Sequence, residues 1–220
     1  MQTPKNTSFI ISYLALRIGL GFVGISLPIV LIIGSFLFSN CGTLQASISH
    51  YYYTVMGNYF VGALSAVAMF LFFYKGYDKQ DAAVANLAGF CALGVAFFPT
   101  GVDYASTCNY ITSQMPSVNT IHYLSAGLLF SCFAYFSLVL FTKTHQPHNI
   151  TPHKKIRNNI YKICGLVIVA CILLLAIYHF VGNLQLKLAM YKPTLVLESI
   201  ALFAFGISWV TKGEMYLKDN

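Results

Sequence analysis

The chain has 220 residues, of which 57% are hydrophobic and 9% are charged, with a net charge of +7 and a mean hydropathy of +0.68. Soluble domains carry about 25% charged residues, so this composition excludes a disordered chain, a nucleic-acid-binding domain and an ordinary cytosolic enzyme. It favours a protein that crosses a membrane several times.

Six apolar segments follow one another along the chain. The predicted spans cover residues 14–38, 53–74, 82–98, 120–142, 160–181 and 194–211. About 20 mostly apolar residues cross the hydrocarbon core as a helix, and only helices and closed barrels satisfy their backbone hydrogen bonds in lipid. The segments lack the alternation typical of barrel strands. We therefore predict an all-α polytopic membrane protein, a single six-helix transmembrane domain over residues 1–220.

The first predicted span contains the sequence GLGFVG at residues 19–24, which matches G-x-G-x-x-G. In dinucleotide-binding proteins this pattern follows a strand within a βαβ unit, whereas here it lies inside a predicted transmembrane helix. Small residues let two membrane helices approach closely. We therefore interpret these glycines as a helix-packing surface.

The distribution of Lys and Arg predicts the orientation of the chain. If the N-terminus is cytoplasmic, eleven of the 13 basic residues lie on the cytoplasmic side, and only Lys187 and Lys192 lie outside. Basic residues collect on the cytoplasmic side of membrane proteins. We therefore predict that both termini are cytoplasmic, in the inner membrane of a bacterium, with the lipid bilayer and no nucleic acid as a partner.

Two of the six cysteines, Cys41 and Cys108, lie in loops that this orientation places outside, and the other four lie within predicted spans. An oxidising compartment favours disulfide formation. We predict a Cys41–Cys108 disulfide, with two unpaired thiols as the alternative.

Ionisable side chains away from the cytoplasmic side all fall near the outer face. His50 precedes the second span, Asp103 lies in the loop after the third, and His122 opens the fourth. His179 lies near the outer end of the fifth span, and Glu198 lies about one turn into the sixth. The topology therefore predicts that five positions far apart in the sequence converge on one layer.

A carboxylate or imidazole is costly to bury in a bilayer, so such groups usually face a bundle interior or a wet cavity. His122 and Glu198 are therefore the strongest candidates for a functional site, and a structural contact between helices is the alternative. Ser49 and Ser125 add hydroxyl groups at this level, and Ser125 shares a helix face with His122 because it lies three residues later. A Glu–His pair can transfer protons, hold a metal or position a lipid headgroup.

Several short segments resemble the FRAG/DRAM/SFK superfamily of six-span membrane proteins and related uncharacterised bacterial six-span families. The segments are SISHYYY at 47–53, residues 89–100 ending in FFPT, IHYLSA at 121–126, and Glu198 followed by AFGISW at 204–209. In that superfamily a histidine opens the fourth span and a glutamate lies in the sixth, and His122 and Glu198 match those positions. Its eukaryotic members are linked to lipid-anchor remodelling, lipid distribution and autophagy. The resemblance therefore implies a lipid-related role without a defined catalytic chemistry.

The residue types are also similar to those of the ceramidase and progestin-receptor-like membrane hydrolases, which use Ser, Asp and three His to hold zinc at one membrane face. Ser49, Asp103, His50, His122 and His179 offer these types here. Those proteins have seven spans and an H-x-x-x-H pair in the last. This chain departs from them, with six predicted spans and no such pair.

Three functions remain open from the sequence. The first is binding of a lipid headgroup or small polar ligand in an outer-leaflet cavity around His122 and Glu198. The second is a lipid hydrolase in which zinc, held by His50, His122 and His179, activates a water molecule. The third is a haem-binding electron carrier with His122 and His179 as axial ligands.

Overall fold

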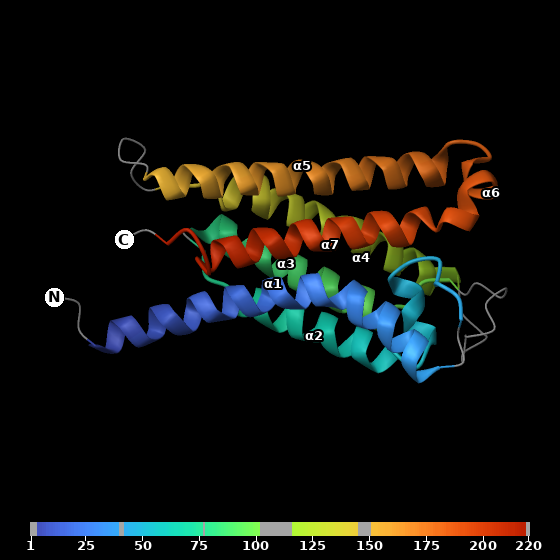
Figure 1. Cartoon of the computed structure of the whole chain (residues 1–220), viewed down its shortest axis with the longest axis horizontal. Coiled ribbons are helices and arrows are strands. Elements are labelled where there is room, and N and C mark those ends of the chain that lie inside the picture. The colour runs from blue at the N-terminus through green and yellow to red at the C-terminus, as the bar shows by residue number, and fades with distance from the viewer. Residues whose placement is uncertain (1–3, 40–41, 77, 102–115, 145–150, 219–220) are drawn as a thin grey trace.

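The computed structural model describes residues 4–39, 42–76, 78–101, 116–144 and 151–218, and every regular element within them is helical (Figure 1). The long helices are α1 (Pro4–Phe38), α2 (Gly57–Phe73), α3 (Lys79–Phe97), α4 (Pro116–Tyr135), α5 (Pro152–Phe180) and α7 (Pro193–Lys212). The short elements are η1 (Ser49–Tyr53), the π-helical η2 (Phe136–Leu140), α6 (Leu184–Leu188) and η3 (Ala189–Tyr191). The predicted all-α class is confirmed.

Five helical segments in the described residues are long and apolar enough to cross a membrane. They are Tyr13–Phe38, Lys79–Phe97, Val118–Leu140, Pro152–Phe180 and Pro193–Lys212. The remaining long helix, α2, is apolar but has 17 residues. It starts later than predicted because the chain before it forms η1 and a turn, in which the Thr54 hydroxyl donates to the Tyr51 carbonyl and accepts the Met56 N–H. This architecture is that of a membrane-embedded protein.

The long helices run side by side along the long axis of the bundle (Figure 1). α1 begins and α7 ends at one end of the bundle, here called the terminal end, whereas η1 and α6 lie at the opposite end, the α6 end. The most extensive contacts join α1 to α7, α2 to α3, α5 to α7 and α3 to α4. Segments from all parts of the sequence therefore meet at the α6 end.

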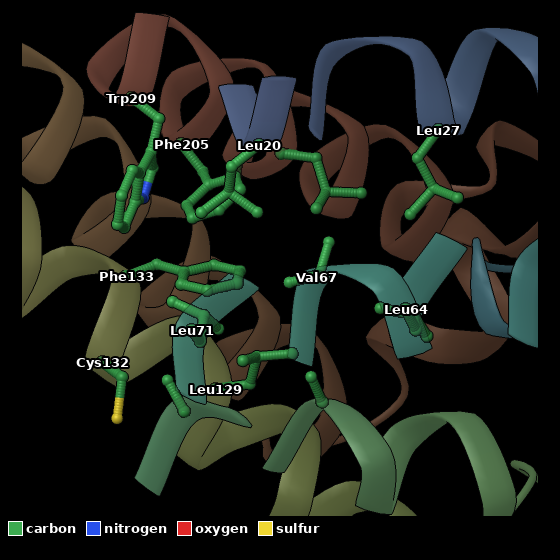
Figure 2. Packing of buried hydrophobic residues seen from close by; sticks show 14 of the residues in the cluster. Leu20, Leu27, Leu64, Val67, Leu71, Leu129, Cys132, Phe133, Phe205 and Trp209 are labelled. Atoms are coloured by element: carbon green, nitrogen blue, oxygen red, sulfur yellow. The ribbon is translucent and has the colours of Figure 1, made fainter. Parts of the chain in front are cut away.

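An apolar core fills the centre of the bundle (Figure 2). Its side chains come from all six long helices, and include Leu20, Leu27, Leu64, Val67, Leu71, Leu129, Phe133, Phe205 and Trp209. The rings of Phe133 and Phe205 stack with their centroids 3.8 Å apart, which joins α4 to α7. Large apolar side chains also cover the outside of the bundle, as Phe180 shows with 86% exposure. Apolar surfaces on both the inside and the outside are typical of helices in lipid.

The glycines of α1 allow close contact with α7. A Cβ atom at Gly21 would lie 2.6 Å from the carbonyl oxygen of Gly206, and one at Gly24 would lie 2.7 Å from the ring of Phe205. A Cβ at Gly19 would meet nothing within 4 Å. The helix-packing interpretation is therefore confirmed at Gly21 and Gly24 and is wrong for Gly19, because that position faces away from α7.

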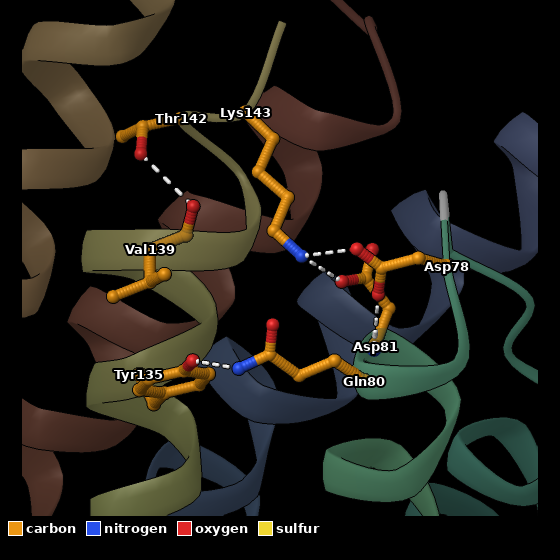
Figure 3. Close-up of polar contacts among 7 residues, drawn as sticks. All are labelled: Asp78, Gln80, Asp81, Tyr135, Val139, Thr142 and Lys143. Atoms are coloured by element: carbon orange, nitrogen blue, oxygen red, sulfur yellow. Dashed lines mark hydrogen bonds and ion pairs between the residues drawn. The ribbon is translucent and has the colours of Figure 1, made fainter.

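An ion-pair cluster fixes the terminal end (Figure 3). Lys143 Nζ lies 2.9 Å from Asp78 Oδ2 and 2.6 Å from Asp81 Oδ1, and the Asp81 side chain is 1% exposed. Asp78 also caps α3, since its Oδ1 accepts the Asp81 N–H at 3.0 Å. The hydrogen bond from Lys143 lowers the pKa of Asp78, and the hydrogen bond to Asp81 raises the pKa of Lys143. The segment after η2 is thereby held against the start of α3.

Candidate functional site

Glu198 holds the segment before η1 against α7. Its Oε2 accepts the backbone N–H of Ile48 at 2.7 Å, and the Leu195 N–H donates to the carbonyl of Ala46 at 3.2 Å. Pro193 opens α7, where its missing N–H costs nothing, so Glu198 lies within the second turn of that helix. These two bonds fix the backbone of Ile48 beside the first residue of η1, Ser49.

His122 connects three elements at the same end. Its Nδ1 lies 2.7 Å from the carbonyl oxygen of Phe98, and its Nε2 lies 3.0 Å from Ser49 Oγ. The Phe98 carbonyl is available because α3 ends at Phe97, ahead of Pro99, as a helix does before a proline. The last carbonyls of a helix have no partner within it. His122, which is 2% exposed, therefore ties α4 to the end of α3 and to η1.

The other two predicted histidines have polar partners nearer the surface. His50 Nδ1 lies 2.6 Å from Ser47 Oγ, and His179 Nδ1 accepts from Gln185 Nε2 at 3.0 Å. Gln185 belongs to α6, so this contact joins the end of α5 to the connection that leads into α7.

One cavity of 210 Å³ brings most of the predicted residues together. Its wall includes Ser49, His50, His122, His179 and Glu198, and it also includes Thr100, which follows α3. We call it the polar cavity. Four of the five positions expected to converge therefore line one cavity.

One predicted residue, Ser125, is not part of the wall of the polar cavity. The side chain of Ser125 packs against Gly94 of α3, because the helix rotation that directs His122 to η1 turns Ser125 toward α3. Asp103, Cys41 and Cys108 lie outside the described residues, so the carboxylate and the disulfide stay predictions.

Lys192 is a cavity residue that the candidate set did not contain. It lies just before α7 with a left-handed backbone, at φ 49°. Among the described residues its ammonium has no hydrogen-bond or ion-pair partner. The sequence did offer one signal for it, because the predicted topology leaves only two basic residues on the outer side of the membrane and Lys192 is one of them.

Two apolar spaces adjoin the polar cavity. The larger, which we call the lateral groove, has a volume of 510 Å³ and lies between α5, the α6–η3 connection and α7. It shares Tyr178 and Pro193 with the polar cavity. The smaller, which we call the inner slot, has a volume of 40 Å³ and points into the core; it shares Ser49, Ala126 and Glu198 with the polar cavity. The site thus joins polar and apolar compartments.

The predicted zinc ligands are not assembled into a metal site within the described residues. No group of three or more His, Cys, Asp or Glu side chains there is placed to hold a metal ion. Both ring nitrogens of His122 already face protein partners, the Phe98 carbonyl and the Ser49 hydroxyl. The zinc and haem interpretations stay predictions without support from this geometry.

No protein-family model, curated protein or solved structure matches this chain. The resemblance to the six-span superfamily therefore stays a prediction. The function has to be argued from the polar cavity and the two apolar spaces that adjoin it.

Proposed function

We propose that this protein binds an amphipathic lipid, with the headgroup in the polar cavity and an acyl chain in the lateral groove. The observation that supports this most strongly is that a polar space of 210 Å³ and an apolar space of 510 Å³ share Tyr178 and Pro193. A lipid has the same division into a polar and an apolar part. Such a molecule satisfies both compartments at once, whereas a small polar ligand leaves the groove unfilled.

In the proposed arrangement all six long helices cross the membrane, and the α6 end lies in the outer leaflet with both termini cytoplasmic. The basic residues support this orientation, because eleven of 13 then lie on the cytoplasmic side. The shorter α2 and η1 together cover the second predicted span. The lateral groove then lies at the depth of the acyl chains, and the polar cavity lies at the depth of the headgroups. A reporter enzyme fused to the C-terminus tests the orientation, because periplasmic activity of that fusion contradicts it.

The charges of the polar cavity favour a phosphate-containing headgroup. The Lys192 ammonium can pair with a phosphate, and imidazole N–H groups of His50 and His179 can donate to its oxygens. The Glu198 carboxylate can accept from a hydroxyl or an ammonium of the same headgroup. We therefore expect a glycerophospholipid with a polar or amine-bearing headgroup.

The groove is tested with two neighbouring substitutions on α5. Leu174 lines the lateral groove, whereas Leu173 does not, and the two side chains are 50% and 58% exposed. Leu174→Trp should fill the groove and reduce the phospholipid retained in native mass spectrometry of the protein purified in mild detergent. Leu173→Trp should retain as much as the unsubstituted protein. Equal retention in both variants, or no retained phospholipid at all, contradicts the proposal.

The headgroup is tested at Lys192. Lys192→Gln should weaken binding of a phospholipid by about tenfold, since a hydrogen bond to a charged group contributes about 1.5 kcal/mol. Lys187→Gln removes the other predicted outside charge, from α6 and not from the cavity wall, and should leave binding unchanged. Equal losses in the two variants would show that the cavity does not recognise the phosphate. Elemental analysis of the same preparation tests the zinc prediction.

A further inference from the structure

The pair formed by Ser49 and His122 has the geometry of a nucleophile and its base. A carbonyl oxygen only accepts hydrogen bonds, so the Phe98 carbonyl, 2.7 Å away, fixes the proton of the neutral ring on Nδ1. Nε2 then carries the lone pair, and it accepts the Ser49 hydroxyl at 3.0 Å. This is the tautomer that removes a proton from a serine, with a third group that orients the ring.

The backbone around Ser49 is held from two directions. Glu198 accepts the N–H of Ile48 at 2.7 Å, and the Tyr53 hydroxyl donates to the carbonyl of Thr100 at 2.5 Å. η1 is thus tied to α7 at its start and to the segment after α3 at its end. Because Phe98 and Thr100 flank Pro99, the group that orients His122 and the group that holds η1 belong to the same short segment. A nucleophile requires such fixed positioning relative to its base.

Ser49 lies at the boundary between the polar cavity and the inner slot. Its side chain is part of the walls of the polar cavity and the inner slot, although the residue is only 6% exposed. In a glycerophospholipid the ester carbonyls lie between the polar headgroup and the apolar chains. Ser49 is not part of the wall of the lateral groove, so the ester that reaches it is one that lies in the polar cavity, next to the headgroup.

We propose that Ser49 and His122 cleave a carboxylic ester of an amphipathic lipid in the polar cavity; this inference rests on the proposed lipid-binding function. Ser49 Oγ forms a bond to the ester carbonyl carbon, and its proton passes to His122 Nε2. The bond from that carbon to the alcohol oxygen breaks, and Nε2 returns the proton to the departing alcohol. A water molecule, deprotonated by the same Nε2, then forms a bond to the acyl carbon. The bond from that carbon to Ser49 Oγ breaks, Nε2 returns the proton to Oγ, and a carboxylic acid is released. Glu198 is a positioning residue, since it holds Ile48.

The test uses the full-length protein in detergent micelles and a phosphonofluoridate that carries an alkyl chain. This probe modifies an activated serine covalently, and the modified residue is located by mass spectrometry. We expect modification of Ser49, together with hydrolysis of a nitrophenyl ester of a medium-chain fatty acid. Ser49→Ala should abolish both, and His122→Gln should reduce hydrolysis by about 10²–10⁴-fold. Ser199→Ala is the matched control, because Ser199 is not part of the cavity wall and its hydroxyl donates to the Leu195 carbonyl of its own helix.

Glu198 distinguishes positioning from a purely structural contact. Glu198→Gln keeps an oxygen that can accept the Ile48 N–H and should lower kcat for the nitrophenyl ester much less than Glu198→Ala does. KM should change little in either variant, because this ester carries no headgroup for Glu198 to contact. A merely structural role would change the thermal stability of both proteins without a split between kcat and KM.

The outcomes separate this inference from the proposed function. If the unsubstituted protein retains phospholipid but its Ser49 is not modified, ester cleavage is refuted and lipid binding stands. If Ser49 is modified but Leu174→Trp does not reduce retained phospholipid, the lipid-binding proposal fails and the nucleophile stands. Modification of Ser49 in the unsubstituted protein shows whether Ser49 is an activated nucleophile, even if the His122 variant does not fold.

Discussion

Gly21→Ala is expected to destabilise the bundle because it forces α1 away from α7. The new Cβ would lie 2.6 Å from both the Gly206 carbonyl oxygen and Val210 Cγ2, whereas ordinary van der Waals contact begins at 3.4 Å. The two helices must therefore separate locally by about 0.8 Å, and one of the atoms in the way is backbone that cannot rotate aside. Overpacking of this kind costs about 3 kcal/mol at the upper end of its usual range. Ala recovers about 1 kcal/mol relative to Gly in a helix, which leaves a net loss of about 2 kcal/mol.

Gly19→Ala is the control on the same helix. A Cβ there meets nothing within 4 Å, so this variant should gain the helix-forming preference of Ala, about 1 kcal/mol. The two variants should differ by about 3 kcal/mol. Unfolding in mixed micelles with increasing sodium dodecyl sulfate measures the difference, followed by fluorescence of Trp209, the only tryptophan, which is buried on α7. If Gly21→Ala is as stable as Gly19→Ala, the close α1–α7 contact is wrong.

Three further predictions concern polar contacts between helices. Lys143→Ala removes the ammonium partner of the buried Asp81 carboxylate and should lower the free energy of unfolding by about 3 kcal/mol. Adding Asp81→Asn to this variant should restore part of the lost stability. If the losses of the two single variants simply add in the double variant, the pairing is contradicted. The hydrogen bond from Lys143 is the main cause of the lowered pKa of Asp78. This contact therefore stabilises the fold fully above the ordinary pKa of 3.8, and the stabilisation is lost as the pH falls through the lowered pKa. The difference in thermal midpoint between the unsubstituted protein and Asp78→Asn should therefore shrink at acidic pH. If this difference stays constant down to strongly acidic pH, the stabilising role of the Asp78–Lys143 contact is contradicted. Ser208→Ala removes the 2.9 Å hydrogen bond to Ser137 between two buried residues and should cost about 1 kcal/mol in the same unfolding assay. Ser131→Ala, whose hydroxyl bonds the Gly127 carbonyl of its own helix on an exposed face, should cost much less, and equal losses would refute the inter-helix contact.

Much of the fold follows directly from the sequence. The apolar segments predicted the long helices because a chain in lipid has to satisfy its backbone hydrogen bonds internally. Pro99 accounts for the end of α3, since a residue before proline avoids the helical conformation. The glycines at 21 and 24 predicted close packing, because only a side chain as small as hydrogen permits it. Each of these inferences depends on local chemistry, which the order of residues alone specifies.

The sequence predicted at which end of the bundle the candidate site lies, but not which of its side chains contact one another. The topology placed His50, His122, His179 and Glu198 at one end, and these residues do line one cavity. The partner of His122 was not predictable from spacing. Ser125 shares its helix face by spacing, yet the hydroxyl that His122 contacts belongs to Ser49, 73 residues away.

The sequence by itself therefore determined the class of the protein, the positions of its helices and the end at which its ionisable groups gather. The tertiary structure alone decided which of them touch, that Lys192 joins them, and that an apolar groove opens beside them. The physical reason is that these helices are apolar on nearly all sides, so periodicity does not specify their rotation. Rotation is set by close packing, such as that between Gly21 and Gly206, and it directs His122 to Ser49 and Ser125 to α3.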